Sequence, residues 1–272
     1  GGLILDYVDS HRALEENNER LARVASELET QTGALRVAND RLEQFAYVAS
    51  HDLQEPLRMV ASYTQLLADR YQGRLDAKAD TFIGYAVDGA RRMETLIRDL
   101  LAFSRVGREQ VPPGPVEAGA AVREALRNLE HALQEAGGRV DIGPLPVISA
   151  DRTLLVQLFQ NLLGNAIKFH GEAAPRIVVT AEPTDGGWTF CVRDHGIGIE
   201  AAHVDRIFRP FQRLHARGEY PGNGIGLAIC RRIVEHHGGR IWAESVTGQG
   251  AAFRFEWPRD PSGTTAEALD LS

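Results

Sequence analysis

The chain has 272 residues, a formal net charge of −7, 43% hydrophobic and 25% charged residues, and two cysteines. This is the composition of a globular protein whose length suits two compact domains, and its acidic balance excludes nucleic acid as the main partner, which would require a basic excess. No apolar run approaches the roughly 18 residues of a membrane span, and the first residues do not form a signal peptide, so we expect a cytoplasmic protein.

Residues 11–45 are expected to form one long helix that pairs with another helix. Leucine recurs at every seventh residue from Leu14 to Leu42, which is the heptad pattern of a coiled coil. A narrow apolar stripe of this length favours self-association over packing on the helix's own domain. We therefore predict a homodimeric, coiled-coil signalling helix, preceded at residues 1–10 by the end of an upstream segment.

Residues 46–106 are predicted to form a helical hairpin. A turn-like patch at residues 71–76 separates the first helix from a second helix, for which Asp76 is the expected N-cap. Two such hairpins, one from each chain, would form a dimeric four-helix bundle. The second helix carries an apolar stripe that would pack on the first helix, made by Phe82, Gly89, Met93, Leu96, Leu100 and Phe103.

The rest of the chain mixes helix and strand patterns. Proline and glycine cluster at residues 107–115, which predicts a linker. Residues 116–258 indicate an α+β sandwich in which helices cover one face of a mixed sheet, and the polar tail at residues 259–272 is expected to be disordered. Cys191 and Cys230 lie among apolar residues and are interpreted as buried thiols. Helices are expected at about 117–136, 151–169 and 226–237, and strands at 176–183, 188–194, 239–245 and 250–258.

His51 is the first candidate for chemistry. On a helix that turns about 100° per residue, it lies opposite the apolar stripe and faces solvent. Asp52 is its neighbour, and Pro56 removes a backbone hydrogen bond, so the helix is expected to bend within a turn of the histidine. An exposed imidazole beside a carboxylate can act as a nucleophile, although this window alone favours an ordinary surface histidine.

A row of polar side chains is predicted on the helix at 151–169. Asn161, Asn165 and Lys168 recur at i, i+4 and i+7, opposite a buried apolar stripe. Amide oxygens can bind Mg²⁺, and the ammonium can bind phosphate. The row therefore suits an anionic ligand that carries a metal ion, with a solvated helix face as the alternative.

Two glycine clusters point to a nucleotide. Asp194 ends a predicted strand and precedes Gly196 and Gly198, so its carboxylate can accept a hydrogen bond from an exocyclic amine while a flat base approaches the backbone. The second cluster opens a helix, whose N-terminal amides can bind an anion. Its glycines are Gly222, Gly224 and Gly226, and the polar stretch before it, residues 214–221, is interpreted as a mobile lid.

Five segments, in this order, resemble a known family. HDLQEPL, NLLGNAIKF, DHGIGI, IFRPF and GNGIGLAI are similar to the H, N, G1, F and G2 boxes of the sensor histidine kinases of two-component systems. The resemblance covers roughly residues 40–258. It implies a dimerisation and phosphoacceptor hairpin, followed by an ATP-binding domain of the fold shared with DNA gyrase and related chaperone ATPases.

The resemblance also implies the reaction. His51 would accept the γ-phosphoryl group of ATP, with Asp52 orienting or deprotonating its imidazole. The phosphoryl group would then pass to an aspartate in the receiver domain of a response regulator. Glu55 stands where many members carry Thr or Asn thought to position a water, so we expect weak phosphatase activity.

Further residues match the family's ATP-binding positions. Asn165 matches the magnesium ligand, and Lys168 matches the lysine near the phosphates. Arg213 matches the lid arginine that reaches the terminal phosphate, and Asp194 matches the residue that reads the adenine amine. The other matched positions are Asn161, Gly196, Gly198, Gly222, Gly224, Gly226 and Leu227.

Several alternatives stay open. Leu3 to Asp6 resemble the end of a PAS-type sensor, so a PAS-like or similar cytosolic sensor is expected upstream. A dimeric nucleotide-binding scaffold without kinase activity is a second hypothesis. A gyrase- or chaperone-type ATPase is a third, although those families lack the hairpin with His51. The sequence leaves open whether His51 is phosphorylated within its own chain or across the dimer.

Overall fold

The computed structural model describes residues 20, 23–24, 26–28, 30–33, 53–107, 112–214, 220 and 222–259. By internal contacts the chain divides into two units, Gly1–Ala49 and Ser50–Ser272. The described residues of the first unit are helical and exposed, including Val24 and Leu28 of the predicted seam. The rest of the predicted coiled coil lies outside the described residues. Among the described helices, none has both the length and the apolar content needed to cross a membrane.

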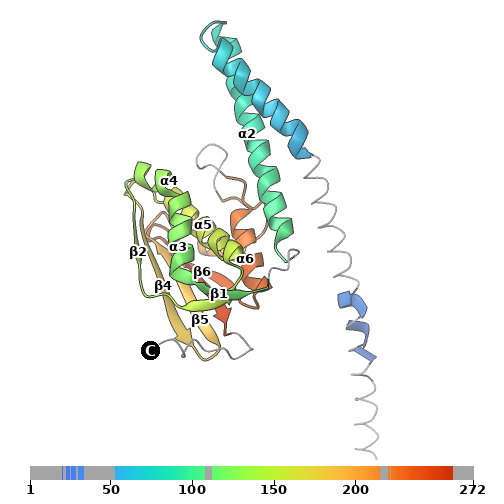
Figure 1. Ribbon diagram of the computed structural model, residues 1–272, viewed down its shortest axis with the longest axis vertical. Coiled ribbons are helices and arrows are strands. Elements are labelled where there is room, and N and C mark those ends of the chain that lie inside the picture. The colour runs from blue at the N-terminus through green and yellow to red at the C-terminus, as the bar shows by residue number, and fades with distance from the viewer. Residues whose placement is uncertain are drawn as a thin grey trace, which may run out of the picture. The chain divides into compact units, whose positions relative to one another are not determined.

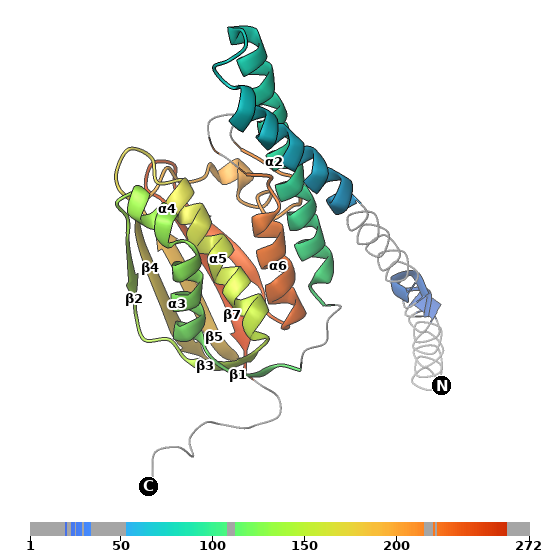
Figure 2. The same cartoon turned by 45° about the horizontal axis from the view of Figure 1, so that its top comes forward.

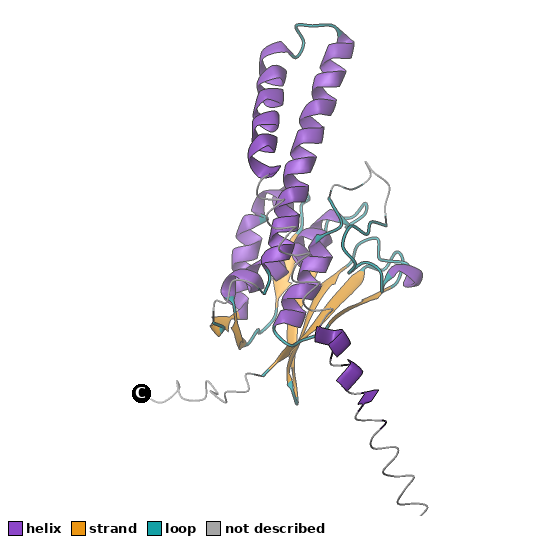
Figure 3. Ribbon diagram, turned by 90° about the vertical axis from the view of Figure 1, so that its right-hand side faces the viewer, coloured by secondary structure: helices purple, strands orange, loops and turns teal. Residues whose placement is uncertain are grey.

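The helical hairpin is present as predicted. Residues 53–71 form one helix, and α2 (Ala77–Arg105) runs back beside it (Figures 1 and 3). Asp76 caps α2, because its carboxylate accepts a hydrogen bond from the backbone N–H of Ala79 at 2.8 Å. The predicted turn and N-cap are therefore confirmed.

Two side-chain interactions hold the hairpin together. At the turn, the backbone N–H of Gly73 donates to both carboxylate oxygens of Asp80, each at 3.0 Å. Further from the turn, the guanidinium of Arg91 on α2 donates to the side-chain oxygen of Gln65 on the first helix, at 2.7 Å. The first contact closes the turn, and the second connects the two helices.

The apolar stripe predicted on α2 does not face the first helix along its whole length, and that prediction is wrong in part. Phe82 and Met93 are exposed, whereas the buried residues Ala90 and Leu101 lie about a quarter of a turn away. Phe103 packs instead against the core of the following domain. The heptad pattern shows that a face is apolar, but it does not show which surface covers that face.

A strand that the sequence did not predict begins inside the expected linker. β1 (Gly114–Glu117) pairs antiparallel with β3 (Val147–Ala150) to form a small two-stranded sheet. Pro115 is compatible with this sheet, because β1 has a partner on one side only. The helix expected at 117–136 is divided, at Leu129, into α3 (Ala118–Asn128) and α4 (Glu130–Glu135).

The remaining elements build the α+β sandwich that was predicted. A five-stranded mixed sheet has the order β2-β4-β5-β7-β6, with β2 parallel to β4 and the other pairs antiparallel. Helices α3, α5 and α6 lie on one face of this sheet (Figure 2). The bounds are β2 Arg139–Ile142, α5 Arg152–Lys168, β4 Arg176–Thr184, β5 Gly187–Asp194, the 3-10 helix η1 Ala201–His203, α6 Gly226–His236, β6 Ile241–Ser245 and β7 Ala251–Pro258.

An aromatic cluster fixes α5 on the sheet. The rings of Phe190 on β5 and Phe255 on β7 stack with centroids 4.9 Å apart, and Phe159 of α5 packs edge-on against both. The indole N–H of Trp257 donates to the Ser149 carbonyl at 3.0 Å, which ties the small sheet to the large one. Both cysteines are buried free thiols, as predicted.

Candidate active site

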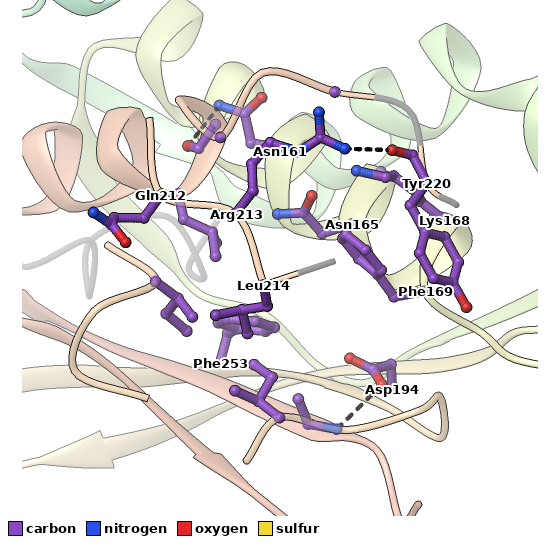
Figure 4. A pocket seen from close by; sticks show the side chains of 18 of the residues that line it. Asn161, Asn165, Lys168, Phe169, Asp194, Gln212, Arg213, Leu214, Tyr220 and Phe253 are labelled. Carbon is purple, nitrogen blue, oxygen red and sulfur yellow. Dashed lines mark hydrogen bonds between the residues drawn. The ribbon is translucent and has the colours of Figure 1, made fainter. Parts of the chain in front are cut away.

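A cavity of about 390 Å³ lies between α5, the end of β5 and the loop that leads into α6 (Figure 4). Gly196 lies beside it and donates its backbone N–H to Asp194, although it does not line it. His51 and Asp52 lie outside the described residues. The other predicted nucleotide residues all line the cavity: Asn161, Asn165, Lys168, Asp194, Gly198, Arg213, Gly222, Gly224, Gly226 and Leu227.

The polar row on α5 borders this cavity as its spacing predicts. Asp151 caps the helix by accepting hydrogen bonds from two backbone N–H groups, which fixes where the helix begins. Asn161 donates its amide N–H to the Gly226 carbonyl at 3.3 Å, so it holds the start of α6 against α5. Asn165 and Lys168 point into the cavity from the next turns (Figure 4).

Lys168 is a half-buried cation at the side of the cavity that Arg213 and Tyr220 also line. Most of the predicted lid at residues 214–221 lies outside the described residues. Its ammonium lies 4.2 Å from the centroid of the Phe169 ring. Burial lowers the pKa of Lys168 to about 8, with a smaller contribution from the nearby positive charge of Arg213. Arg213 itself donates to the carbonyl of Tyr220 at 2.9 Å. Two cations close together at one end of a cavity favour a polyanionic ligand.

Asp194 lies at the sheet side of the cavity, at the end of β5 (Figure 4). One of its carboxylate oxygens accepts hydrogen bonds from the backbone N–H groups of Gly196 at 2.9 Å and Ala251 at 3.1 Å. Burial raises the pKa of Asp194, and these two hydrogen bonds oppose that rise. Glycine is required at position 196, because a Cβ there would lie 2.1 Å from the Phe169 carbonyl oxygen.

The glycine loop before α6 brings backbone close to the cations. Gly222 has φ +129°, and a Cβ on it would lie 2.9 Å from the Lys168 ammonium nitrogen. In the described part of the chain, no side chain caps α6, so its first N–H groups face the cavity side uncapped. A glycine loop followed by a helix N-terminus has the geometry that can bind an anion, here next to Lys168.

The comparisons with known proteins agree with this geometry. Residues 41–109 match the family "His Kinase A (phospho-acceptor) domain", and residues 150–261 match "Histidine kinase-, DNA gyrase B-, and HSP90-like ATPase". The chain belongs to the histidine kinases. Within this family the hairpin is the phosphoacceptor and dimerisation module, and the sandwich is the ATPase module.

Individual relatives of this histidine kinase include sensor proteins. It is 49% identical over 255 residues to "Cyanobacterial phytochrome A" of Nostoc sp., a match that covers 93% of this chain and 33% of that protein. It is 31% identical over 242 residues to "Sensor protein kinase WalK" of Staphylococcus aureus, covering 84% of this chain and 58% of that protein. The chain therefore spans about a third of the phytochromes it matches.

A solved structure is similar over most of this chain. Full-length ShkA in complex with AMPPNP superposes with a TM-score of 0.62 at 30% identity, over 79% of this chain and 45% of that chain. This likeness covers both the hairpin and the sandwich, which supports the fold of the kinase as described.

Some residues that line the cavity of the kinase were not predicted from the sequence. Phe253 on β7 alternates with polar residues and is recognisable only as a core position. Tyr220 places its ring 4.9 Å from that of Phe169. Asp99 belongs to α2, in the other module, and no local signal marks it. The contacts of these three residues depend on the tertiary fold.

The donor groups fit a magnesium ion that is shared with phosphates. Among the residues that the structure describes, no cluster of three or more His, Cys, Asp or Glu side chains could hold a metal on its own. The oxygen donors on the cavity wall include the amide oxygen of Asn165. Mg²⁺ is commonly held by one or two protein oxygens together with waters and substrate phosphates.

Proposed function

We propose that this kinase phosphorylates its own His51 from Mg-ATP and passes the phosphoryl group to an aspartate of a response regulator. One observation carries this proposal: a single cavity joins the amide and ammonium row of α5 to Asp194 and to the glycine loop before α6. Those groups complement a purine amine at one end and a triphosphate at the other. The phosphoacceptor hairpin precedes this module in the same chain.

Each end of the nucleotide has a matching group. Asp194 accepts a hydrogen bond from the exocyclic amine of adenine, since its carboxylate is held in place by two backbone N–H groups. Lys168 and Arg213 bind the phosphates, together with the N–H groups at the start of α6. Asn165 would hold Mg²⁺, which neutralises phosphate charge when bound. Asn161 positions α6 through the Gly226 carbonyl.

The proposed transfer is an in-line substitution at phosphorus. A ring nitrogen of His51 forms the N–P bond as the bond from the γ-phosphorus to the bridging oxygen of ADP breaks. Asp52 orients the imidazole and holds the proton on its other nitrogen. The phosphoryl group then moves from nitrogen to a carboxylate oxygen of the regulator's receiver domain.

The exposed apolar residues of the hairpin support a homodimer. Leu53, Val60 and Leu67 recur every seventh residue on the first helix, and all three are exposed in a single chain. A second hairpin that covers them would complete a four-helix bundle. We further propose that a sensor joined through the coiled coil controls the kinase in the cytoplasm. This proposal is supported by the phytochrome relative, of which this chain matches only 33%.

Labelling with γ-³²P-ATP tests the proposed reaction. The full chain should acquire a label that is stable to base and labile to acid, and His51→Gln should abolish the label. The control is His131→Gln, because His131 is an exposed histidine on α4 whose loss should leave the label unchanged. A chain that binds ATP but never acquires label would favour the nucleotide-binding scaffold.

A second assay tests the expected weak phosphatase activity. Glu55 is exposed on the first helix of the hairpin, four residues after His51 in the sequence. A carboxylate there repels the anionic phosphoryl group and takes the place of the neutral Thr or Asn side chain that positions the water. Glu55→Thr should therefore accelerate dephosphorylation of the phosphorylated regulator. Fast dephosphorylation by the unmodified chain, unchanged in the variant, would contradict the expectation.

A further inference from the structure

The nucleotide cavity contains a carboxylate from the hairpin. Asp99, near the C-terminal end of α2, lines the cavity together with Lys168 and the glycine loop. Its carboxylate accepts a hydrogen bond from the side-chain amide of Asn223 at 3.1 Å. Asn223 is the residue between Gly222 and Gly224, so the hairpin directly contacts the loop that precedes α6.

Asp99 places a carboxylate next to the proposed phosphate site. Asn223 follows Gly222, whose Cβ would lie 2.9 Å from the Lys168 ammonium nitrogen, and the uncapped N-terminus of α6 follows three residues later. Burial raises the pKa of Asp99, while Asn223 and the exposed Arg98 lower it. The carboxylate is therefore partly desolvated where phosphates are expected to bind, and its repulsion of them is only weakly screened.

A second contact, away from the cavity, joins the end of the hairpin to α6 itself. Arg232 of α6 donates to the Val106 carbonyl at 3.2 Å, just past the end of α2. Its guanidinium carbon also lies 4.8 Å from the centroid of the Phe103 ring. This contact is made by the second turn of α6 and does not involve the glycine loop. Figure 2 shows α2 and α6 side by side.

We propose that Asp99 is a latch that opposes ATP: its carboxylate holds the glycine loop through Asn223, and the triphosphate must displace it to bind. Nucleotide binding and docking of the hairpin then exclude each other at this point, while Arg232 keeps α2 attached as a pivot. By thermodynamic linkage, the latch lowers the affinity for ATP by the same factor by which bound ATP weakens docking of the hairpin. This inference rests on the proposed position of the triphosphate.

Calorimetric titrations of the full chain with adenosine, ADP and a non-hydrolysable ATP analogue, all at constant Mg²⁺, test the latch. Asp99→Asn keeps a hydrogen-bond acceptor of the same size but removes the charge. It should tighten binding of the ATP analogue about tenfold and of ADP less, and leave adenosine unchanged. The control is Asp88→Asn, which changes an exposed carboxylate on the same helix and should have no effect.

The outcomes separate the latch from the proposed function. If the unmodified chain binds no ATP analogue, the proposed function fails. If the chain binds it but Asp99→Asn binds it equally or more weakly, the latch fails alone, and weaker binding would make Asp99 a ligand of the Mg-nucleotide. Equal tightening for adenosine would also overturn the latch, since repulsion acts only on phosphates.

A second measurement does not depend on any variant. In the unmodified chain, the ATP analogue should increase amide hydrogen exchange at residues 96–103 of α2, because the latch opens. Adenosine should not produce this increase. Exchange that stays constant or decreases on addition of the ATP analogue would refute the proposal.

Discussion

The lowered pKa of Lys168 makes ATP affinity sensitive to mildly basic pH. The pKa of this ammonium in the free protein is about 8, whereas an unperturbed lysine titrates near 10.5. Only the protonated form can pair with phosphate, so affinity should fall as pH rises through 8. The last ionisation of a phosphate group has a pKa near 6, so the phosphates contribute little to a change in affinity above pH 7.5.

The expected size follows from the fraction of Lys168 that is protonated. With a pKa of about 8, that fraction is about 76% at pH 7.5 and about 9% at pH 9, which predicts an about eightfold loss of affinity. Calorimetric titration of the full chain with a non-hydrolysable ATP analogue at both pH values measures it. Lys168→Arg is the matched control, because arginine stays protonated throughout and should give a flat profile.

Two results would refute this reasoning: an unmodified chain whose affinity does not change between the two pH values, or a Lys168→Arg variant with the same decline. Stability provides an independent check. Because the folded pKa lies below the unfolded one, the unfolded chain binds more protons between about pH 8 and 10.5, and Lys168 should make the free energy of unfolding rise with pH there. Lys168→Met should lack this contribution.

Three further predictions concern the adenine side of the cavity and the hairpin. Asp194→Asn should weaken ATP binding about tenfold or more in titrations, because the new amide N–H would face the adenine amine, another donor. Gly196→Ala should lower the free energy of unfolding by more than about 2 kcal/mol in denaturant titrations and weaken ATP binding, because its Cβ would meet the Phe169 carbonyl oxygen. Asp80→Ala should cost about 1 kcal/mol in thermal unfolding and leave ATP affinity unchanged, because it removes the acceptor of the Gly73 N–H at the far turn.

Each of these predictions has a contrary outcome. Normal ATP affinity in Asp194→Asn would mean that another group reads the base. An Asp194→Asn variant that binds GTP better than ATP would instead support direct reading of the amine. Full stability of Gly196→Ala would show that the Phe169 carbonyl can move away. A loss of ATP affinity in Asp80→Ala would mean that the hairpin turn and the cavity are coupled.

Local patterns were sufficient to predict the part of the site that lies within single elements. Asn161, Asn165 and Lys168 share a face because of the helical repeat alone, and that repeat is visible in the sequence. Asp194 was recognisable because it ends a strand and precedes glycines. The order of five such segments then indicated the family.

The other features depend on contacts between distant segments. Asp99 enters the cavity only because α2 packs beside α6, and no periodicity in α2 encodes this neighbour. β1 escaped prediction because Pro115 and the two prolines just before the strand are typical of a linker, although an edge strand accepts Pro115. The division of the helix at Leu129 has no glycine or proline to signal it.

The position of β1 in the sequence limits how far the sandwich can move from the hairpin. Between Arg105, the last residue of α2, and Gly114, the first of β1, lie only eight residues. A chain of that length reaches at most about 30 Å when fully extended. In the proposed homodimer, an ATP bound to the sandwich would therefore stay at a high effective concentration near a hairpin of the same dimer, and the rate of phosphoryl transfer should be independent of the total dimer concentration. Lengthening this eight-residue connection with glycine and serine would lower the effective concentration of the bound nucleotide near the hairpin without changing any residue that lines the cavity.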